Sequence, residues 1–271
     1  MKYWMSAKVG EYIEIVSTRW LSSGFNPTPF WPQLPGFASQ CAVCHSWPAR
    51  QVCQACVSRF AAAQLRCGAC ALALPADLSM GRQTTQTLCG ACVRQRPPLD
   101  AALAAVPYAY PWSTLIARYK FGGQHAWARF FAERLLNTPG VLPAFNELGA
   151  SDWVIPMPLS AERLQTRGFN QAWELAAALA SQTQTRAQAD ARLLLRLKHT
   201  PPQSQLKRDA RLANVRGAFQ VDPLRAVGLQ GRRVVLVDDV MTSGASMYAA
   251  AQALRDAGAA YITAVVLART Q

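Results

Sequence analysis

The architecture of this chain can be deduced from one stretch, Val234-Val235-Leu236-Val237-Asp238-Asp239-Val240-Met241-Thr242-Ser243-Gly244-Ala245-Ser246. Its four leading apolar residues predict a strand buried at the centre of a parallel sheet. Two acids follow at the carboxyl end of that strand, and a turn rich in hydroxyl groups leads into a helix expected over residues 246–257. Because open α/β sheets bind ligands at this end of their strands, the stretch predicts a ligand site as well as a strand.

The turn has the composition of a site for a phosphate monoester. Its candidate binding residues are Thr242, Ser243, Gly244, Ala245 and Ser246. Backbone N–H groups at a helix N-terminus bind anions, and the three hydroxyl groups add further donors. Asp238 and Asp239 are placed to accept hydrogen bonds from a sugar diol, and the diol or a magnesium ion would separate them from the phosphate. The alternative is an ordinary strand–turn–helix without a ligand. No Gly-Lys-Ser/Thr follows, so a Walker-type loop is excluded.

The flanking segments alternate between strand-like and helix-like patterns. Strands are expected at residues 101–108, 153–156 and 262–267, and helices at residues 113–136, with a break at Gly122-Gly123, and at about 170–181. A long polar stretch at about 198–217 interrupts the alternation. This order of elements predicts an α/β fold with a mainly parallel sheet.

All eight cysteines belong to four Cys-x-x-Cys pairs. The candidate metal ligands are Cys41, Cys44, Cys53, Cys56, Cys67, Cys70, Cys89 and Cys92. Two such pairs complete the four-sulfur shell that zinc prefers, so the eight sulfurs suffice for two structural zinc ions. The pairs can combine in sequence or interleaved, and shorter loops favour the sequential scheme. A redox dithiol and an iron–sulfur cluster are the alternatives, but a segment with few apolar side chains favours folding around metal.

The balance of charge points to phosphate-bearing partners. The 271 residues carry a net charge of +13, and most of the excess lies in residues 41–100 and 151–230. Nucleic acid and a polyphosphorylated small molecule both fit this excess, and a generally basic surface is the alternative. No apolar run is long enough for a membrane span, and no secretory leader is visible. We therefore expect a cytoplasmic protein with reduced thiols.

Residues 234–246 resemble the phosphoribosyl-pyrophosphate (PRPP) loop of type I phosphoribosyltransferases. Other segments resemble the ComF competence-protein family, which also has a cysteine-rich N-terminal zinc ribbon. These are Tyr119-Lys120-Phe121-Gly122-Gly123, Ile155-Pro156-Met157-Pro158-Leu159-Ser160 with Arg163, Arg167-Gly168-Phe169-Asn170-Gln171, Thr200 and Gln203, and Arg211 with Asn214-Val215-Arg216-Gly217-Ala218-Phe219. The resemblance covers about residues 41–271 and implies a double zinc ribbon at 41–100 and a type I phosphoribosyltransferase-like domain at 101–271. Residues 1–40 lie outside it, and because they show no sustained helical or alternating period we expect an irregular extension there.

The resemblance also implies roles for the candidate site residues. The ribose of magnesium-bound PRPP would lie at the catalytic candidates Asp238 and Asp239, its 5′-phosphate at residues 242–246, and its pyrophosphate at Arg163 and Arg167. The basic stretch at 198–217 would close over the substrate. The alternatives are that the two arginines are merely solvated at helix ends and that the stretch is an ordinary polar loop.

Two functional hypotheses follow from the resemblance, and neither names an acceptor. The first is a PRPP-binding phosphoribosyltransferase with a role in DNA uptake during natural transformation. The second is a non-catalytic protein that handles single-stranded DNA and keeps a PRPP or nucleotide site as a sensor. The partners implied are single-stranded DNA and a competence helicase or other DNA-uptake proteins.

Overall fold

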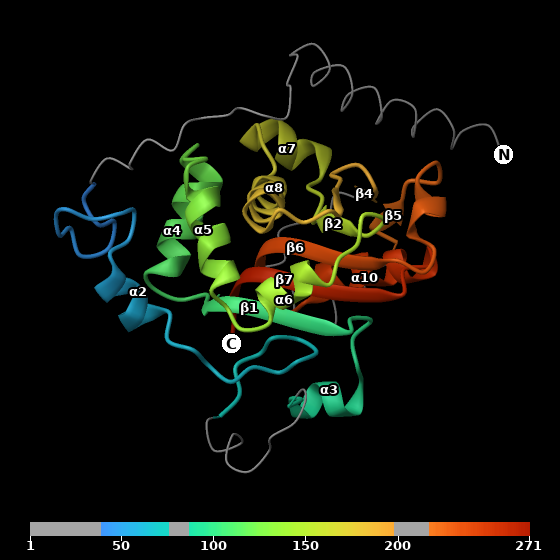
Figure 1. Ribbon diagram of the computed structural model, residues 1–271, viewed down its shortest axis with the longest axis horizontal. Coiled ribbons are helices and arrows are strands. Elements are labelled where there is room, and N and C mark those ends of the chain that lie inside the picture. The colour runs from blue at the N-terminus through green and yellow to red at the C-terminus, as the bar shows by residue number, and fades with distance from the viewer. Residues whose placement is uncertain (1–38, 76–86, 198–216) are drawn as a thin grey trace. The chain divides into compact units, whose positions relative to one another are not determined.

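Five parallel strands form the main sheet, in the spatial order β1-β7-β6-β2-β3 (Figure 1). They are β1 (Ala101–Pro107), β2 (Trp153–Pro156), β3 (Gln188–Ala189), β6 (Arg233–Met241) and β7 (Tyr261–Arg269). The structure, a computed structural model, describes residues 39–75, 87–197 and 217–271. The α/β class with a mainly parallel sheet is confirmed.

The central strands β6 and β7 are nine residues long and almost wholly buried, because helices cover both faces of the sheet. The pairing of β6 with β7 does not stop at the apolar run. It continues past the two acids, with Asp238 opposite Val266 and Met241 opposite Arg269. The two acids therefore belong to the C-terminal part of β6 and do not follow it. The strand is longer than the sequence indicates.

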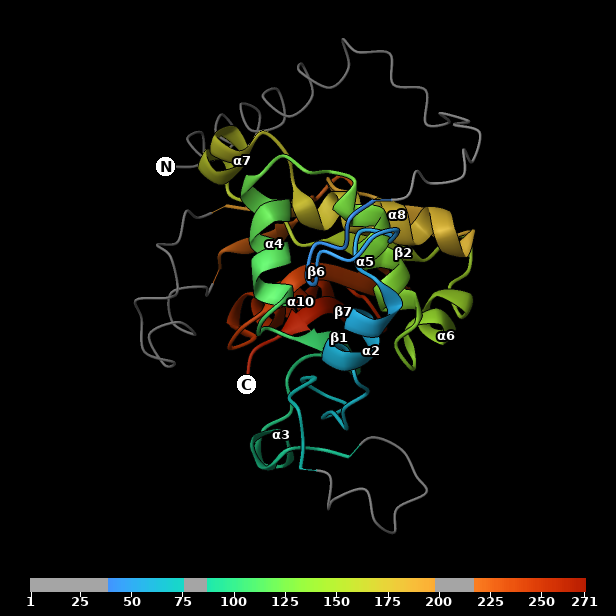
Figure 2. The same ribbon diagram turned by 90° about the vertical axis from the view of Figure 1, so that its left-hand side faces the viewer.

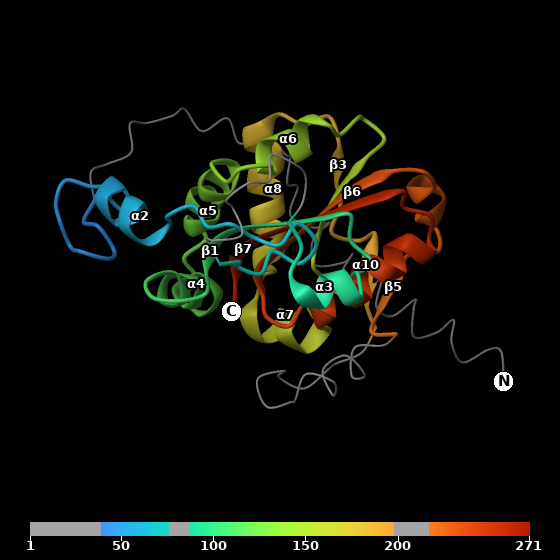
Figure 3. The same ribbon diagram turned by 90° about the horizontal axis from the view of Figure 1, so that it is seen from below.

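Helices pack on the two faces of the sheet (Figure 3). One face carries α4 (Trp112–Phe121), α5 (Trp127–Leu136), α6 (Val141–Asn146) and α8 (Gln171–Thr183). The other face carries α10 (Ala245–Asp256). Successive residues of β6 alternate between these two cores: Val235 and Val237 join the first, and Val234 and Leu236 join the second.

The helix expected over residues 113–136 is two helices, and the predicted break is confirmed. Gly122 ends α4, where a Cβ atom would lie 2.6 Å from the carbonyl oxygen of Arg118. Gly123 follows with a φ of 61°. Helix α7 (Ala161–Arg167) is not expected from the sequence, because none of its residues is buried and no apolar period marks it.

Strands β4 (Leu194–Arg196) and β5 (Phe219–Val221) form a two-stranded antiparallel sheet. In the sequence, β4 precedes the long polar stretch and β5 follows it. A short 3-10 helix, η3 (Ala226–Leu229), follows β5. The loop predicted to close over a substrate falls on residues 198–216, with Lys198, Lys207, Arg208, Arg211 and Arg216, and lies outside the described residues.

The cysteine-rich segment contains two short helices, α2 (Gln54–Phe60) and α3 (Gly90–Arg94) (Figure 2). It lies beside β1 at the edge of the sheet, where the Ala102 N–H donates to the Gly68 carbonyl at 2.8 Å. On the α4 side, Trp112 Nε1 donates to the Phe60 carbonyl at 2.7 Å. The segment is thus tied to the sheet edge and to a helix of the larger fold.

The predicted extension at 1–40 lies outside the described residues except for its last two positions, where Ser39 pairs with Ala49. Residues 39–271 cluster as one unit, and the division into a ribbon at 41–100 and a domain at 101–271 stays a prediction. Within the described ranges, no helix has the length and apolar character needed to cross a membrane.

Candidate functional site

The two acids of β6 lie in different surroundings, since neighbouring side chains of a strand point to opposite faces. Asp238 is half-buried, whereas Asp239 is only 2% exposed on the face that carries α4 and α8. The Asp239 N–H donates to Asp238 Oδ1 at 2.9 Å. Two carboxylates therefore meet at the carboxyl end of the sheet, where parallel α/β folds bind ligands.

Side chains from α4 and α8 converge on Asp239. The ammonium nitrogen of Lys120 lies 2.6 Å from Oδ2, and Gln171 Nε2 donates to Oδ1 at 3.4 Å. The Lys120 contact is a short ion pair, which gives the buried Asp239 Oδ2 a charged partner. A carboxylate oxygen can accept more than one hydrogen bond, so the site can also take a ligand hydroxyl, and the two carboxylates together offer the hard oxygen donors that magnesium takes.

Burial and ion pairing divide the charge of the acid pair unequally. Burial, together with the adjacent charge of Asp239, raises the pKa of Asp238 well above its usual value. Burial acts in the same direction on Asp239, but the charge of Lys120 and hydrogen bonds from Lys120, Asp238 and Gln171 together lower the pKa of Asp239. Burial opposes the charge of Lys120, yet the facing carboxylates raise the pKa of Lys120. The pair therefore holds one firmly charged and one readily protonated carboxyl.

The turn after β6 brings the five predicted phosphate-binding residues together at the N-terminus of α10. Gly244 has a φ of 84°, and a Cβ there would lie 2.5 Å from Tyr248 Cζ, so the turn needs glycine for its conformation and for space. Ser243 Oγ accepts a hydrogen bond from the Ala245 N–H at 3.4 Å. The first N–H groups of a helix lack partners within the helix, so this terminus can bind an anion.

A cavity of about 190 Å³ joins the acids, the turn and α7. Its lining includes Lys120, Arg163, Arg167, Gln171, Arg196, Asp238, Asp239, Thr242, Gly244, Ala245 and Ser246. Ser160 caps α7 by accepting from the Arg163 N–H at 3.4 Å, which sets both arginines on the cavity wall. Burial lowers the pKa of Arg167. Of the predicted ligand-binding residues, only Ser243 does not line the cavity.

Three charged or polar residues of the cavity lining are absent from the candidates that the sequence indicates. Lys120 and Gln171 both lie in segments that carry the family resemblance. The resemblance marks these segments but does not indicate what the two side chains bind. Arg167 donates a short hydrogen bond to Gln171 Oε1. The side-chain amide of Gln171 therefore links the guanidinium group of Arg167 to the carboxylate of Asp239. Arg196 of β4 is the third, and no sequence pattern marks it.

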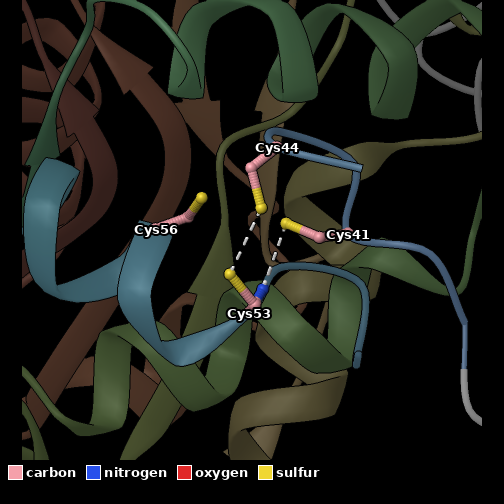
Figure 4. A group of neighbouring side chains, drawn as sticks. All are labelled: Cys41, Cys44, Cys53 and Cys56. Carbon is pink, nitrogen blue, oxygen red and sulfur yellow. Dashed lines mark hydrogen bonds between the residues drawn. The ribbon is translucent and has the colours of Figure 1, made fainter. Parts of the chain in front are cut away.

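The cysteines form two groups of four, combined in sequence. In each group the sulfur atoms all lie within 4.8 Å of one another. We call Cys41, Cys44, Cys53 and Cys56 the first tetrad, and Cys67, Cys70, Cys89 and Cys92 the second tetrad. Figure 4 shows the sulfurs of Cys41, Cys44 and Cys53 directed toward one another, with Cys56 approaching from α2. The fold thus shows the sequential combination of the Cys-x-x-Cys pairs. Each tetrad can hold one metal ion.

The sulfur geometry fits zinc. A tetrahedron with zinc–sulfur bonds of about 2.3 Å has sulfur–sulfur edges of about 3.8 Å. The Cys44 and Cys53 sulfurs are 3.6 Å apart, and the Cys70 and Cys89 sulfurs are 3.7 Å apart. Backbone N–H groups also point at sulfur, from Cys53 to Cys41 and from Cys89 to Cys67, each at 3.3 Å. Such donors stabilise thiolate ligands.

The tetrads differ in burial and in neighbours. Cys44 is exposed, and Cys41 and Cys56 pack into the core that includes α4 and α5. All four cysteines of the second tetrad are buried in the core that includes α10. Arg66 lies next to the second tetrad, and burial together with the charge of Arg269 lowers its pKa. Two guanidinium groups therefore lie near the second tetrad.

A family model described as the phosphoribosyl transferase domain matches residues 197–271, which include β6, the turn and α10. The "DNA utilization protein YhgH" of Escherichia coli O157:H7 is 33% identical over 184 residues, covering 67% of this chain and 78% of that protein. The "Competence protein F" of Haemophilus influenzae is 32% identical over 181 residues, with the same coverage of 67% and 78%. The "Competence protein ComFC" of Bacillus subtilis is 32% identical over 118 residues, covering 43% of this chain and 44% of that protein.

Proposed function

This chain belongs to the ComF family of proteins with a phosphoribosyltransferase domain, and we propose that it binds PRPP with magnesium at the carboxyl end of β6. The observation that carries the proposal is one cavity that joins two adjacent carboxylates at the end of β6 to the phosphate-type turn. A ribose diol supplies donors to the carboxylates, and a phosphate supplies the acceptor for the N–H groups of the turn.

Each part of PRPP has residues of matching chemistry in this proposal. Asp238 and Asp239 accept hydrogen bonds from the ribose hydroxyls, and residues 242–246 bind the 5′-phosphate. Arg163 and Arg167 face the pyrophosphate, whose oxygens match guanidinium donors. Lys120 keeps Asp239 ionised, so that this carboxylate acts as an acceptor. Bound magnesium would lie on the carboxylate oxygens and offset the charge of the pyrophosphate.

A transfer reaction follows from this placement. The bond from the anomeric carbon to the pyrophosphate oxygen breaks, and its electron pair leaves with pyrophosphate. A nucleophile of the acceptor forms the new bond to that carbon and releases its proton to solvent. The arginines stabilise the charge that develops on the leaving group, and the acid pair holds the ribose while its ring carries positive charge.

The test is calorimetric titration of PRPP with magnesium into the wild type and into the double variant Asp238→Asn with Asp239→Asn. We expect binding by the wild type and a loss of at least tenfold in the double variant. A screen of acceptors for pyrophosphate release then tests catalysis. Absence of PRPP binding by a folded, metal-loaded wild type would overturn the proposal.

A second candidate function is the handling of single-stranded DNA, with the PRPP site as a sensor. Exposed aromatic and basic side chains favour it: Trp47 is 67% and Tyr110 is 63% exposed, and Arg59 lies 5.2 Å from the centre of the Phe60 ring. Phe60 in turn contacts Tyr110 edge to face at 5.7 Å. Bases stack on such rings, and arginine binds the backbone. The names of the relatives, "DNA utilization protein" and "Competence protein F", support a role with DNA. We propose DNA-uptake proteins, a competence helicase among them, as partners.

The DNA proposal is tested with a fluorescent oligothymidine at several salt concentrations. Tyr110→Ala and Arg59→Ala should each weaken binding at least threefold, and Arg59→Ala should also reduce the salt dependence. Val227→Ala is the control, because Val227 is 87% exposed but lies in η3, apart from this group in sequence and structure. Equal affinity of all three variants and the wild type would contradict the assignment.

We also propose that each tetrad holds structural zinc and that the protein works in the cytoplasm. Thiolate ligands are retained where thiols stay reduced, and eight cysteines in two zinc-like tetrads fit such a compartment. Metal analysis of the purified protein should give two zinc ions per chain.

A further inference from the structure

The side chain of Arg269, at the end of β7, lies between the second tetrad and the phosphate-type turn. It is only 7% exposed. On one side its Nε donates to the Cys70 carbonyl at 2.9 Å. On the other side its Nη1 donates to the Met241 carbonyl at 3.3 Å and, in a short contact, to the Thr242 carbonyl. One guanidinium group therefore joins a metal-ligating residue to the first two residues that lead into the turn.

These contacts fix the direction of two peptide groups. A peptide bond is planar and trans, so its carbonyl and the following N–H point in opposite directions. Because Arg269 holds the Met241 and Thr242 carbonyls, the N–H groups of Thr242 and Ser243 point away from it. Thr242 lines the cavity and Arg269 does not. The arginine thus acts on the orientation of donors at the start of the turn without lining the site itself.

The charge of Arg269 has no carboxylate partner within the described ranges. Its hydrogen-bond partners there are backbone carbonyls and the hydroxyl of Thr270. Arg66, on the other flank of the second tetrad, donates to the Ala71 carbonyl at 3.1 Å and to Gln64 at 3.3 Å. Four thiolates around one zinc ion leave two excess negative charges, so the loaded tetrad can balance these two guanidinium groups.

The first tetrad has no such link in the described structure. Its segment contacts α4 through the bond from Trp112 to Phe60, on the opposite face of the sheet from α10. Residues of the second tetrad instead share a core with Met241, Ala245 and Met247 of the turn region, and Tyr248 packs against that core. The two tetrads therefore differ in what they support.

We propose that Arg269 is a positioning residue through which the metal-loaded second tetrad holds the phosphate-binding turn in its competent form. The inference rests on the proposed function, because it concerns the 5′-phosphate end of the PRPP site. Arg163 and Arg167, which face the pyrophosphate, belong to α7 and are not among the hydrogen-bond partners of Arg269 in the described structure. Loss of Arg269 should therefore impair one end of the site and spare the other.

The experiment uses the full chain loaded with zinc and two probes, ribose 5-phosphate and inorganic pyrophosphate with magnesium. Arg269→Gln should weaken binding of ribose 5-phosphate at least tenfold, leave pyrophosphate binding within twofold, and keep two zinc ions per chain. Arg269→Lys, which retains the charge, should recover part of the loss. The matched control is Arg255→Gln, since Arg255 also donates to two carbonyls, at 3.2 Å and 2.6 Å, but at the other end of β7. It should lower stability and leave both affinities unchanged.

A second arm compares the tetrads. Cys92→Ser and Cys44→Ser should each lose one zinc ion, and only Cys92→Ser should weaken ribose 5-phosphate binding. If Cys92→Ser does not fold, the Arg269 variants decide alone. The inference is overturned if Arg269→Gln binds ribose 5-phosphate like the wild type, or if both probes weaken together. A wild type that binds neither probe would instead overturn the proposed function.

Discussion

The ammonium group of Lys120 lies 2.6 Å from Asp239 Oδ2, so the buried acid of the pair has a counter-charge in the unliganded protein. The side chain of Lys120 is 20% exposed and that of Asp239 is 3% exposed. Removal of one partner from a buried ion pair costs more than the pair itself contributes, because the remaining charge is left in a poorly solvating site. The contact therefore matters for stability as well as for ligand binding.

Lys120→Met should destabilise the fold by about 3 kcal/mol, because Asp239 loses its counter-charge. It should also abolish PRPP binding, since Asp239 then takes up a proton more readily. Urea unfolding at pH 7 and titration with PRPP measure the two effects. Arg118→Ala is the control, because Arg118 is an exposed cation of the same helix. Equal loss of stability in the two variants would refute the role of the ion pair.

Asp238→Asn should stabilise the unliganded protein at pH 8 while it weakens PRPP binding. Burial raises the pKa of Asp238, so the folded state retains a proton that the unfolded state releases above about pH 4. Wild-type stability is therefore lost as pH rises through the folded pKa, whereas the variant avoids this loss. A gain of about 1 kcal/mol would raise Tm by about 2–4 °C.

Calorimetric scans of both proteins from pH 4 to pH 8 check this prediction. The difference in Tm should vanish at the acid end, where both side chains are neutral. The amide oxygen of asparagine can still accept the Asp239 N–H, so that hydrogen bond is not a confounding loss. A variant that is less stable than the wild type at pH 8 would show that the charge of Asp238 is favourable in the unliganded fold.

Gly244→Ala should reduce PRPP affinity at least tenfold. The new Cβ would lie 2.5 Å from Tyr248 Cζ and 2.7 Å from Met241 Cε, so the turn must shift. Gly231→Ala is the control that distinguishes backbone strain from a steric clash. Gly231 also has a positive φ, 69°, but there is open space around its Cβ position. That control should cost about 1–2 kcal/mol of stability and leave affinity unchanged. A wild-type affinity in Gly244→Ala would argue against phosphate binding by the turn.

A chelator should remove the two zinc ions at different rates. The first tetrad contains the exposed Cys44, whereas all four ligands of the second tetrad are buried. We expect release of one zinc ion per chain at least tenfold faster than the other, followed with a colorimetric zinc indicator. Cys44→Ser should start with one zinc ion and lack the fast phase. Release of both ions in one phase from the wild type would contradict the difference in protection.

The parts of the site that are contiguous in sequence could be predicted, and the parts assembled by folding could not. The strand, the acids and the turn follow one another within residues 234–246, so their chemistry is visible in one stretch. Gln171 reaches Asp239 from 68 residues away, and Lys120 comes from a different helix. Both residues lie in segments that carry the family resemblance, but the sequence does not show that they contact Asp239. Only the packing of α4 and α8 on the sheet brings their side chains to that acid.

The cysteines show the same limit. Spacing alone predicts metal-binding pairs but permits two ways of combining them. The fold separates the tetrads, with Cys41 in the core of α4 and α5 and Cys67 in the core of α10. Arg269 illustrates the limit most clearly, because its contact with Cys70 spans 199 residues and no local pattern accompanies it.

The hydrogen bond from Ala102 to Gly68 places the cysteine-rich segment against the side of β1 that has no neighbouring strand in the described part of the chain. A sheet edge without a neighbour is a template for pairing with another chain. Loss of metal from this segment would uncover backbone groups that can recruit a second molecule into a continuous sheet. We therefore expect the segment to protect the protein from aggregation, and a fragment beginning at β1 should precipitate even though it retains every residue of the ligand cavity.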